Sequence, residues 1–160
     1  MKSEQEAVRA IELYGDMVRR ICLIHLKNHA DTEDIFQTVF LKYLLYPSDF
    51  QNAGHEKAWF IRVSINACRD LLRSAFRKKT VSLDSLADQP AALTEDNREV
   101  LEAVLGLPAK YRDVIYLHYY EGYTAPEIGQ LLNKNPNTIY TLLNRGKKIL
   151  KEKLGGETDA

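Results

Sequence analysis

The chain has 160 residues, of which 45% are hydrophobic and 28% charged, and its 22 basic and 22 acidic residues cancel to no formal net charge. This length suits one domain or two small ones, and no apolar run reaches the roughly 18 residues that a transmembrane helix needs. The polar start MKSEQEAVRA lacks the apolar core of a signal peptide, and the cysteines, Cys22 and Cys68, lie far apart in separate helical patterns. We therefore expect a cytoplasmic protein without membrane insertion or a disulfide framework.

The first segment, residues 1–79, predicts three helices, because its apolar residues recur at spacings of three and four. The first helix carries such a face over 7–25. The second is expected to open at Asp31, where acidic residues in the first turn complement the helix dipole. The third should run over about 55–74, after a break at 46–54 that contains proline and glycine.

Both later helices of this segment have a predicted buried face, and the third also has a polar stripe. The stripe recurs at spacings of four, three and four, which places it on one side of a helix. The expected buried positions are Ile35, Phe36, Val39, Phe40, Tyr43 and Leu44 in the second helix, and Phe60, Val63, Ala67 and Leu71 in the third. The polar stripe consists of Arg62, Asn66, Arg69 and Arg73.

Charge is distributed unevenly along the rest of the chain. Residues 80–96 carry four acidic and no basic groups, whereas residues 134–153 carry six basic groups and one acidic group. Because the acidic, turn-rich stretch 80–95 lacks helical periodicity, we interpret it as a flexible linker between helical domains at 1–79 and 96–160. Since no strand pattern persists anywhere, the predicted fold class is all-α, with two small helical domains joined by that linker.

Residues 124–145 give the most specific local signal in the chain. Thr124 and Glu127 form the pattern of a capping box, and 133–135 is turn material in which Asn135 can cap a second helix. Two short helices at this spacing form a helix-turn-helix, which places its second helix in the DNA major groove. A plain helical hairpin with a solvated face is the alternative. The buried stripe of the second helix is expected to comprise Ile139, Leu143, Gly146, Leu150 and Leu154, with glycine permitting close packing.

Three stretches, in this order, carry the pattern of a known family. Residues 31–44, DTEDIFQTVFLKYL, resemble its core-binding helix, D-x-E-D-hydrophobic-x-Q-x-x-F. Residues 56–73, EKAWFIRVSINACRDLLR, resemble its promoter-melting helix, W-hydrophobic-x-x-I-x-x-N-x-x-x-D-x-x-R. Residues 107–154 are similar to its L-P-x-x-x-R…G-x-x-x-x-E-I-A…T-V-x-x-x-L-x-R-x-x-x-x-L signature. The chain thus resembles, over nearly its whole length, an RNA polymerase sigma factor of the sigma-70 class in its small extracytoplasmic-function form.

The resemblance implies a protein that binds bacterial core RNA polymerase, directs it to promoter DNA and helps to open the duplex, without catalysis or a cofactor. It also makes an anti-sigma factor a candidate partner. The residues implied to bind polymerase are Asp34, Gln37, Thr38 and Leu41. Apolar groups on more than one face of this helix, including Phe36 and Phe40, favour a surface for a partner. Those implied in promoter melting are Asn52, His55, Trp59, Arg62, Asn66, Arg69 and Arg73. Those implied in the recognition helix are Asn137, Tyr140, Thr141, Asn144, Arg145 and Lys148.

The indole of Trp59 has two interpretations. Together with the 46–56 loop and the arginine stripe it suits unstacked bases and phosphates, but a core aromatic is an equally good account. The sequence also departs from the family in two respects. The early recognition helix lacks the usual bases, which predicts unusual upstream reading, and Gly129 and Gly146 replace the expected alanines, which should loosen packing slightly.

Two other classes of function are the alternatives to this interpretation. A metalloenzyme could use His25 and His29, which are four residues apart, but the residues between them lack the glutamate of a zinc protease helix and no third ligand is evident. No phosphate loop or nucleophile constellation accompanies them, so we expect no metal site and no enzyme. A stand-alone helix-turn-helix transcriptional regulator would explain 107–154 and leave 31–73 as a dimerisation or sensor domain.

Overall fold

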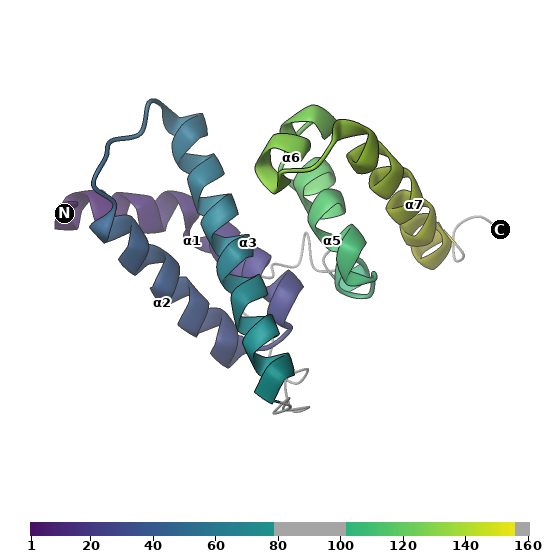
Figure 1. The fold of residues 1–160 in the computed structure, drawn as a ribbon, viewed down its shortest axis with the longest axis horizontal. Helices are drawn as coiled ribbons and strands as arrows, with labels where there is room; N and C mark the ends of the chain where they lie inside the picture. The colour runs from purple at the N-terminus through teal and green to yellow at the C-terminus, as the bar shows by residue number, and fades with distance from the viewer. Residues whose placement is uncertain (79–101, 156–160) are drawn as a thin grey trace. The chain divides into compact units, whose positions relative to one another are not determined.

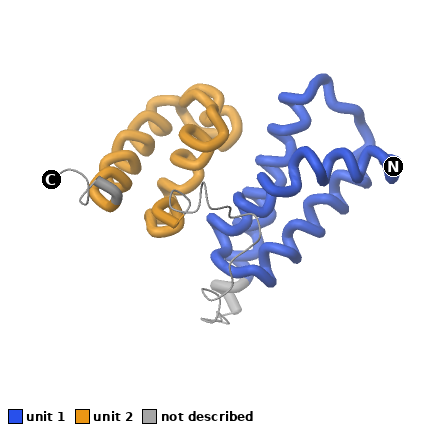
Figure 2. Tube along the Cα trace, turned by 180° about the vertical axis from the view of Figure 1, so that it is seen from behind, with its two compact units in different colours: residues 1–93 blue, residues 94–160 orange. Residues whose placement is uncertain are grey.

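The computed structural model describes the backbone of residues 1–78 and 102–155. This part of the chain is helical and contains no strand, which confirms the all-α fold class. The chain divides into two compact units, residues 1–93 and 94–160 (Figure 2), and the predicted linker 80–95 lies outside the described residues. None of the helices in the described ranges has both the length and the apolar content that crossing a bilayer requires.

The first unit is built from three helices, α1 (Glu4–Leu26), α2 (His29–Leu45) and α3 (Ala53–Lys78) (Figure 1). Each of the three packs against the other two. The start of α1 is fixed by a capping box, in which the Ser3 hydroxyl accepts from the Glu6 N–H and the Glu6 carboxylate accepts from the Ser3 N–H.

Both α2 and α3 begin two residues earlier than the sequence pattern predicted. Asn28, not Asp31, caps α2, since its side-chain oxygen accepts from the Asp31 N–H at 2.7 Å. Likewise, the Asn52 side-chain oxygen accepts from the His55 N–H at 2.8 Å, so that α3 starts at Ala53. The expected break at 46–54 therefore shrinks to a connecting loop of residues 46–52.

Aromatic rings form the centre of this unit. Phe60 is fully buried, and its ring centroid lies 4.8 Å from that of Tyr14 on α1 and 5.1 Å from those of Phe40 and Tyr43 on α2. The predicted burial of Phe60 and Ala67 is confirmed, whereas the two other expected core positions of α3, Val63 and Leu71, are only half-buried.

The second unit contains helical residues 102–105, α5 (Ala109–Ile115), a π-helical turn η2 (Tyr116–Tyr120), α6 (Ala125–Leu132) and α7 (Pro136–Gly155) (Figure 1). The helical segment that begins with α5 therefore widens into a π turn, and the described part of the predicted helical domain at 96–160 begins at residue 102. The core of the second unit includes Ile115, Leu117, Ile128, Ile139 and Leu143.

Two glycines permit close packing within the second unit. A Cβ added at Gly129 would lie 2.7 Å from the carbonyl oxygen of Lys134, and one at Gly146 would lie 2.9 Å from Cγ1 of Ile115. Real Cβ atoms essentially never approach so closely. The prediction that these glycines loosen the packing is therefore wrong, because each allows an approach that alanine would prevent.

Candidate nucleic-acid interface

The turn between α6 and α7 is held by local hydrogen bonds that the sequence predicted. Thr124 and Glu127 form the expected capping box, with the Glu127 carboxylate accepting from the Thr124 N–H at 2.9 Å. The pKa of the Glu127 carboxyl lies below its usual range. The main cause is its hydrogen bond with the backbone of Thr124, and the second cause is hydrogen bonding with the Thr124 side chain. Asn133 ends α6 in the left-handed conformation at φ 56°, and the Asn135 side chain accepts from the Asn137 N–H at 2.8 Å at the start of α7.

One face of α7 is polar and entirely exposed. Its six predicted recognition residues are spaced three, one, three, one and three apart, so they share a side of the helix that is opposite the buried Ile139 and Leu143. The side chain of Tyr140 is 52% exposed and supplies the only large apolar surface of this set. The exposed set consists of Asn137, Tyr140, Thr141, Asn144, Arg145 and Lys148.

The hydroxyl of Thr141 has a restricted role in hydrogen bonding. It donates to the carbonyl oxygen of Asn137 at 3.1 Å within the same helix. A hydroxyl carries one hydrogen and two acceptor lone pairs, so Thr141 can still accept from a base amine. Arg145 and Lys148, one and four residues after Asn144, bring positive charge to the later turns of the face.

In the first unit, the loop 46–52 contributes Tyr46 and Phe50 to an aromatic cluster that also contains Tyr43 of α2 and Trp59 of α3. The rings of Tyr46 and Phe50 stack with centroids 4.9 Å apart, and Trp59 meets them at 5.4 and 5.8 Å. Trp59 is half-buried, because one side of its ring packs on this cluster and on Phe60. It is therefore neither a fully buried core residue nor a free stacking platform.

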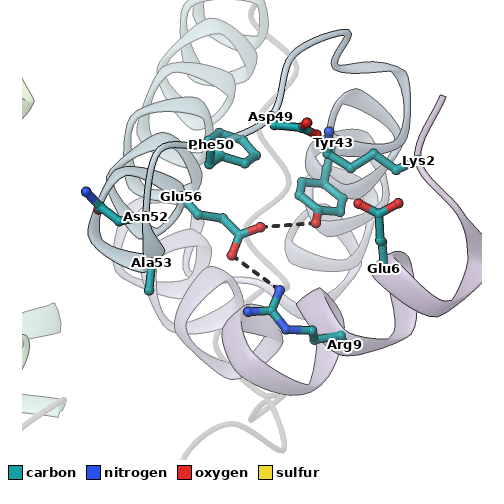
Figure 3. Close-up of a pocket in the computed structure, with 9 residues that line it drawn as sticks. All are labelled: Lys2, Glu6, Arg9, Tyr43, Asp49, Phe50, Asn52, Ala53 and Glu56. Carbon is teal, nitrogen blue, oxygen red and sulfur yellow. Dashed lines mark hydrogen bonds and ion pairs between the residues drawn. The ribbon is translucent and has the colours of Figure 1, made fainter.

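Asn52 and His55, two of the residues implied in promoter melting, both take part in the start of α3. The oxygen of the Asn52 side chain caps the helix, and Nδ1 of His55 accepts from the Gln51 N–H at 3.1 Å. An accepting Nδ1 places the proton of a neutral imidazole on Nε2. The amide nitrogen of Asn52 and Nε2 of His55 are thus the donors that this end of the loop can offer to a base. Figure 3 shows the amide nitrogen of Asn52 directed away from Glu56, at the edge of a pocket.

That pocket has a volume of about 310 Å³ and lies between the loop, the start of α1 and the start of α3. At its base is Glu56, a residue that is 6% exposed as a whole, and its carboxylate accepts from the Tyr14 hydroxyl at 3.0 Å and the Tyr43 hydroxyl at 3.1 Å. Arg9 lies 3.6 Å from the same carboxylate (Figure 3). Burial and the Glu56 carboxylate raise the pKa of Tyr43 to about 12, so its hydroxyl remains a donor. The residues that line the pocket are Lys2, Glu6, Arg9, Tyr43, Asp49, Phe50, Asn52, Ala53 and Glu56.

The polar stripe of α3 extends beyond this pocket along the helix. Arg62, Asn66 and Arg73 are exposed and Arg69 is half-buried. Arg73 lies 3.9 Å from Asp70, and since both side chains are mostly exposed, this ion pair holds the guanidinium only weakly. The stripe therefore presents three guanidinium groups that suit phosphate oxygens.

The predicted polymerase-binding residues form an exposed row on α2. Asp34, Gln37 and Leu41 are exposed, the last at 57%, and Thr38 is half-buried. The reason given for this surface was wrong in one respect, because Phe36 and Phe40 are 9% and 7% exposed and belong to the core. The broad apolar face of α2 is buried because this helix packs against both α1 and α3.

Leu41 and Leu45 are the large apolar side chains of α2 that remain exposed, at 57% and 60%. They are four residues apart and so lie on one side of the helix. This pair, rather than Phe36 and Phe40, is the apolar part of the surface.

The histidine pair considered as a metal site is divided between two helices. His25 is half-buried near the end of α1, and His29 is the exposed first residue of α2. The helical spacing of four therefore does not apply to them. Across residues 1–78 and 102–155, no three His, Cys, Asp or Glu side chains are close enough to hold a metal ion.

Sequence reasoning missed the contributions of Lys2, Arg9 and Glu56 to this region. Lys2 and Arg9 lie near the start of the unit and Glu56 at the start of α3, so they meet their partners only after folding: Glu56 is 42 residues from Tyr14, and Lys2 is 44 residues from Tyr46. Phe50 could have been found, because an aromatic residue in a short loop close to a tryptophan is a visible signal.

Comparison with known proteins agrees with the two-unit fold. Residues 10–78 match the family model described as Sigma-70 region 2, and residues 93–150 match that described as Sigma-70, region 4. The ECF RNA polymerase sigma factor SigW of Bacillus subtilis is 27% identical, with 96% of this chain and 91% of the relative covered. The RNA polymerase sigma factor SigV of the same organism is 28% identical, with 86% and 84% covered.

Two solved structures have the same fold. One is the sigma factor RpoE in complex with the anti-sigma factor NepR from Bartonella quintana, with a TM-score of 0.77, 21% identity, and 94% of this chain and 98% of that chain covered. The other is CnrH in complex with the cytosolic domain of CnrY, with a TM-score of 0.67, 20% identity, and 96% and 90% covered.

Proposed function

The chain belongs to the sigma-70 family of RNA polymerase sigma factors, in its extracytoplasmic-function form, and we propose that it uses the surfaces described above to bind core polymerase and read promoters. It is a sigma factor that directs promoter-specific transcription initiation. Sigma factors regulate transcription and are not catalysts, and we infer that this chain acts in the same way, in the cytoplasm. The observation that carries the proposal is the presence of regions 2 and 4, in that order, in one chain.

A stand-alone helix-turn-helix regulator is not favoured, because it leaves the match of residues 10–78 to region 2 without a purpose. The two hypotheses differ in one direct test. The purified chain should co-elute with bacterial core polymerase in gel filtration, and the complex should bind promoter fragments that core polymerase alone ignores. A chain that binds specific DNA by itself and never associates with core polymerase would be a regulator instead.

For polymerase binding, we propose the exposed row on α2. Asp34 and Gln37 offer polar contacts and Leu41 an apolar one, and all three side chains are exposed. Replacing both Asp34 and Gln37 by alanine should weaken core binding while far-UV helix content stays intact. Glu12→Ala is the control, because Glu12 is also an exposed acidic residue but lies on α1. Unchanged core affinity of the double variant would refute this assignment.

For the downstream promoter element, we propose that the loop 46–52 captures an unpaired base with the donors of Asn52 and His55. The arginines of the α3 stripe would hold the adjacent phosphates, which is why Arg69→Ala combined with Arg73→Ala should impair open-complex formation and flatten its salt dependence. Permanganate footprinting of the melted region measures this. If the footprint of the double variant is the same as that of the wild type, the stripe is only a solvated helix face.

For the upstream element, we propose that α7 enters the major groove with its exposed polar face. Asn144 can form a bidentate contact to adenine, so Asn144→Ala should relax preference at one base pair by about 1–3 kcal/mol. Lys148→Ala should instead weaken binding to all sequences alike and reduce the salt slope by about one unit, since a lysine neutralises one phosphate. If both variants weaken every promoter equally, α7 positions the unit without reading sequence.

An anti-sigma factor is a further proposed partner. The two solved structures named above each contain a second protein, described as an anti-sigma factor in one and as the cytosolic domain of CnrY in the other. The exposed Leu41 and Leu45 offer such a protein an apolar contact on the row proposed for polymerase. A partner bound there would compete with core polymerase, which a competition titration measures.

A further inference from the structure

Lys2 is buried beneath the loop 46–52, which is an uncommon environment for a lysine. The residue is only 9% exposed. Its backbone N–H donates to the carbonyl of Leu44 at 2.9 Å, and its ammonium donates to the carbonyls of Tyr46 at 3.3 Å and Ser48 at 3.1 Å. A lysine is seldom buried unless its charge is paired, and here loop carbonyls are the hydrogen-bond acceptors.

The same ammonium also lies against the aromatic cluster. Its nitrogen is 5.4 Å from the ring centroids of Tyr43 and Tyr46 and 5.5 Å from that of Phe50. Distances below about 6 Å allow a cation–π attraction, which strengthens when the cation is desolvated. Figure 3 shows the Lys2 side chain extending across Tyr43, with its nitrogen toward the loop.

These contacts connect Lys2 to the predicted base-capturing end of the loop. Phe50, which the ammonium contacts, meets the ring of His55 edge-on with centroids 5.3 Å apart. Gln51, the next residue, donates its N–H to Nδ1 of His55 and so sets the tautomer of that ring. One side chain, that of Phe50, therefore contacts both Lys2 and His55.

We propose that Lys2 is a positioning residue for downstream-element reading, which holds the loop 46–52 in the conformation that presents the donors of Asn52 and His55. This inference rests on the proposed function of the loop. Without the ammonium, the carbonyls of Tyr46 and Ser48 lose their donor, and the loop gains conformations in which Phe50 no longer supports His55. The conformational entropy that the loop loses when it captures a base would then oppose binding.

The experiment compares lysine variants in the assembled holoenzyme. Its affinity is measured for single-stranded oligonucleotides that carry the downstream element with each of the four bases at each position in turn. Lys2→Met keeps the apolar stem and removes the charged donor, while Lys2→Gln keeps a neutral donor and Lys2→Arg a charged one. Lys27→Met removes the same charge from the far end of α1 and is the matched control.

Lys2→Met is expected to reduce discrimination between the best base and the others by about tenfold. That factor corresponds to about 1.4 kcal/mol, the order of a hydrogen bond from a charged donor. Lys2→Arg should stay within about threefold of the wild type, and Lys2→Gln should lie between. Core affinity and binding to the upstream duplex should not change in any of them. Fluorescence of Trp59 checks folding, and if Lys2→Met does not fold, the ranking of Lys2→Gln against Lys2→Arg decides.

An equal loss of affinity for all four bases would overturn the proposal, because Lys2 would then have only a structural role. Asn52→Ala separates this failure from that of the loop itself. If Asn52→Ala alters discrimination and the lysine variants do not, only the positioning role is refuted. If neither alters it, the loop does not read a base, and both proposals are refuted together.

Discussion

The buried carboxylate of Glu56 allows a quantitative prediction about what holds the first unit together. Its two oxygens accept from Tyr14 at 3.0 Å and Tyr43 at 3.1 Å, and the side chain is 8% exposed. In Glu56→Gln the amide offers one acceptor oxygen, so one tyrosine hydroxyl faces an NH₂ group instead. Losing a buried hydrogen bond to a charged group costs about 1.5–3 kcal/mol. The ion pair with Arg9, which is 58% exposed, adds little to this value.

We therefore predict that Glu56→Gln lowers the free energy of unfolding of the first unit by about 2–3 kcal/mol, equivalent to a fall in Tm of roughly 10–20 °C for a domain of this size. The assay is fluorescence of Trp59, which is the one tryptophan of the chain and so reports this unit alone.

Glu33→Gln is the matched control for this measurement. Glu33 pairs with Arg19 at 2.9 Å, but both side chains are about a third exposed, so the loss should stay below about 1 kcal/mol. A change below about 0.5 kcal/mol in Glu56→Gln, or a change equal to that of Glu33→Gln, would refute the reasoning.

Three further predictions concern local stability. Thr124→Ala removes the capping hydroxyl of α6 and should cost about 1 kcal/mol in thermal unfolding followed by far-UV circular dichroism. Gly129→Ala should cost about 1–3 kcal/mol despite the better helix propensity of alanine, because its Cβ would lie 2.7 Å from the Lys134 carbonyl; a stabilised variant would contradict the packing. Since burial raises the pKa of Tyr43 to about 12, above an unfolded value of about 10, its stabilising contribution should be complete below pH 10 and lost as the pH rises through 12. The difference in unfolding free energy between the wild type and Tyr43→Phe, measured by Trp59 fluorescence, should therefore shrink over that range, and a constant difference would argue against it.

The features that could be predicted from sequence are those set by neighbouring residues. The capping box of Thr124 and Glu127 and the cap at Asn135 depend on side chains within three residues of each other, and the structure has both. The start of α2 was missed although it is equally local. Asn28 and Asp31 are both good caps, and the earlier one satisfies the N–H of the later.

Features that depend on tertiary packing could not be predicted in this way. Phe36 and Phe40 are buried as their place on the predicted apolar face requires, but the width of that face is explained only by the fold, because α2 packs against both α1 and α3 and so buries a wider face than one partner would need. Lys2 and Glu56 are ordinary surface residue types in the sequence. Their buried roles depend on partners more than 40 residues away, namely Tyr46 for Lys2 and Tyr14 for Glu56.

We propose that this one chain gives core polymerase its promoter specificity. The most direct measurement is in vitro transcription with purified core polymerase on genomic fragments of the organism that encodes the chain, with sequencing of the transcript 5′ ends. We predict start sites that appear only when the chain is added, each preceded by a shared upstream and a shared downstream element at fixed spacing. Start sites that are unchanged by the chain, or new ones without common elements, would contradict the account.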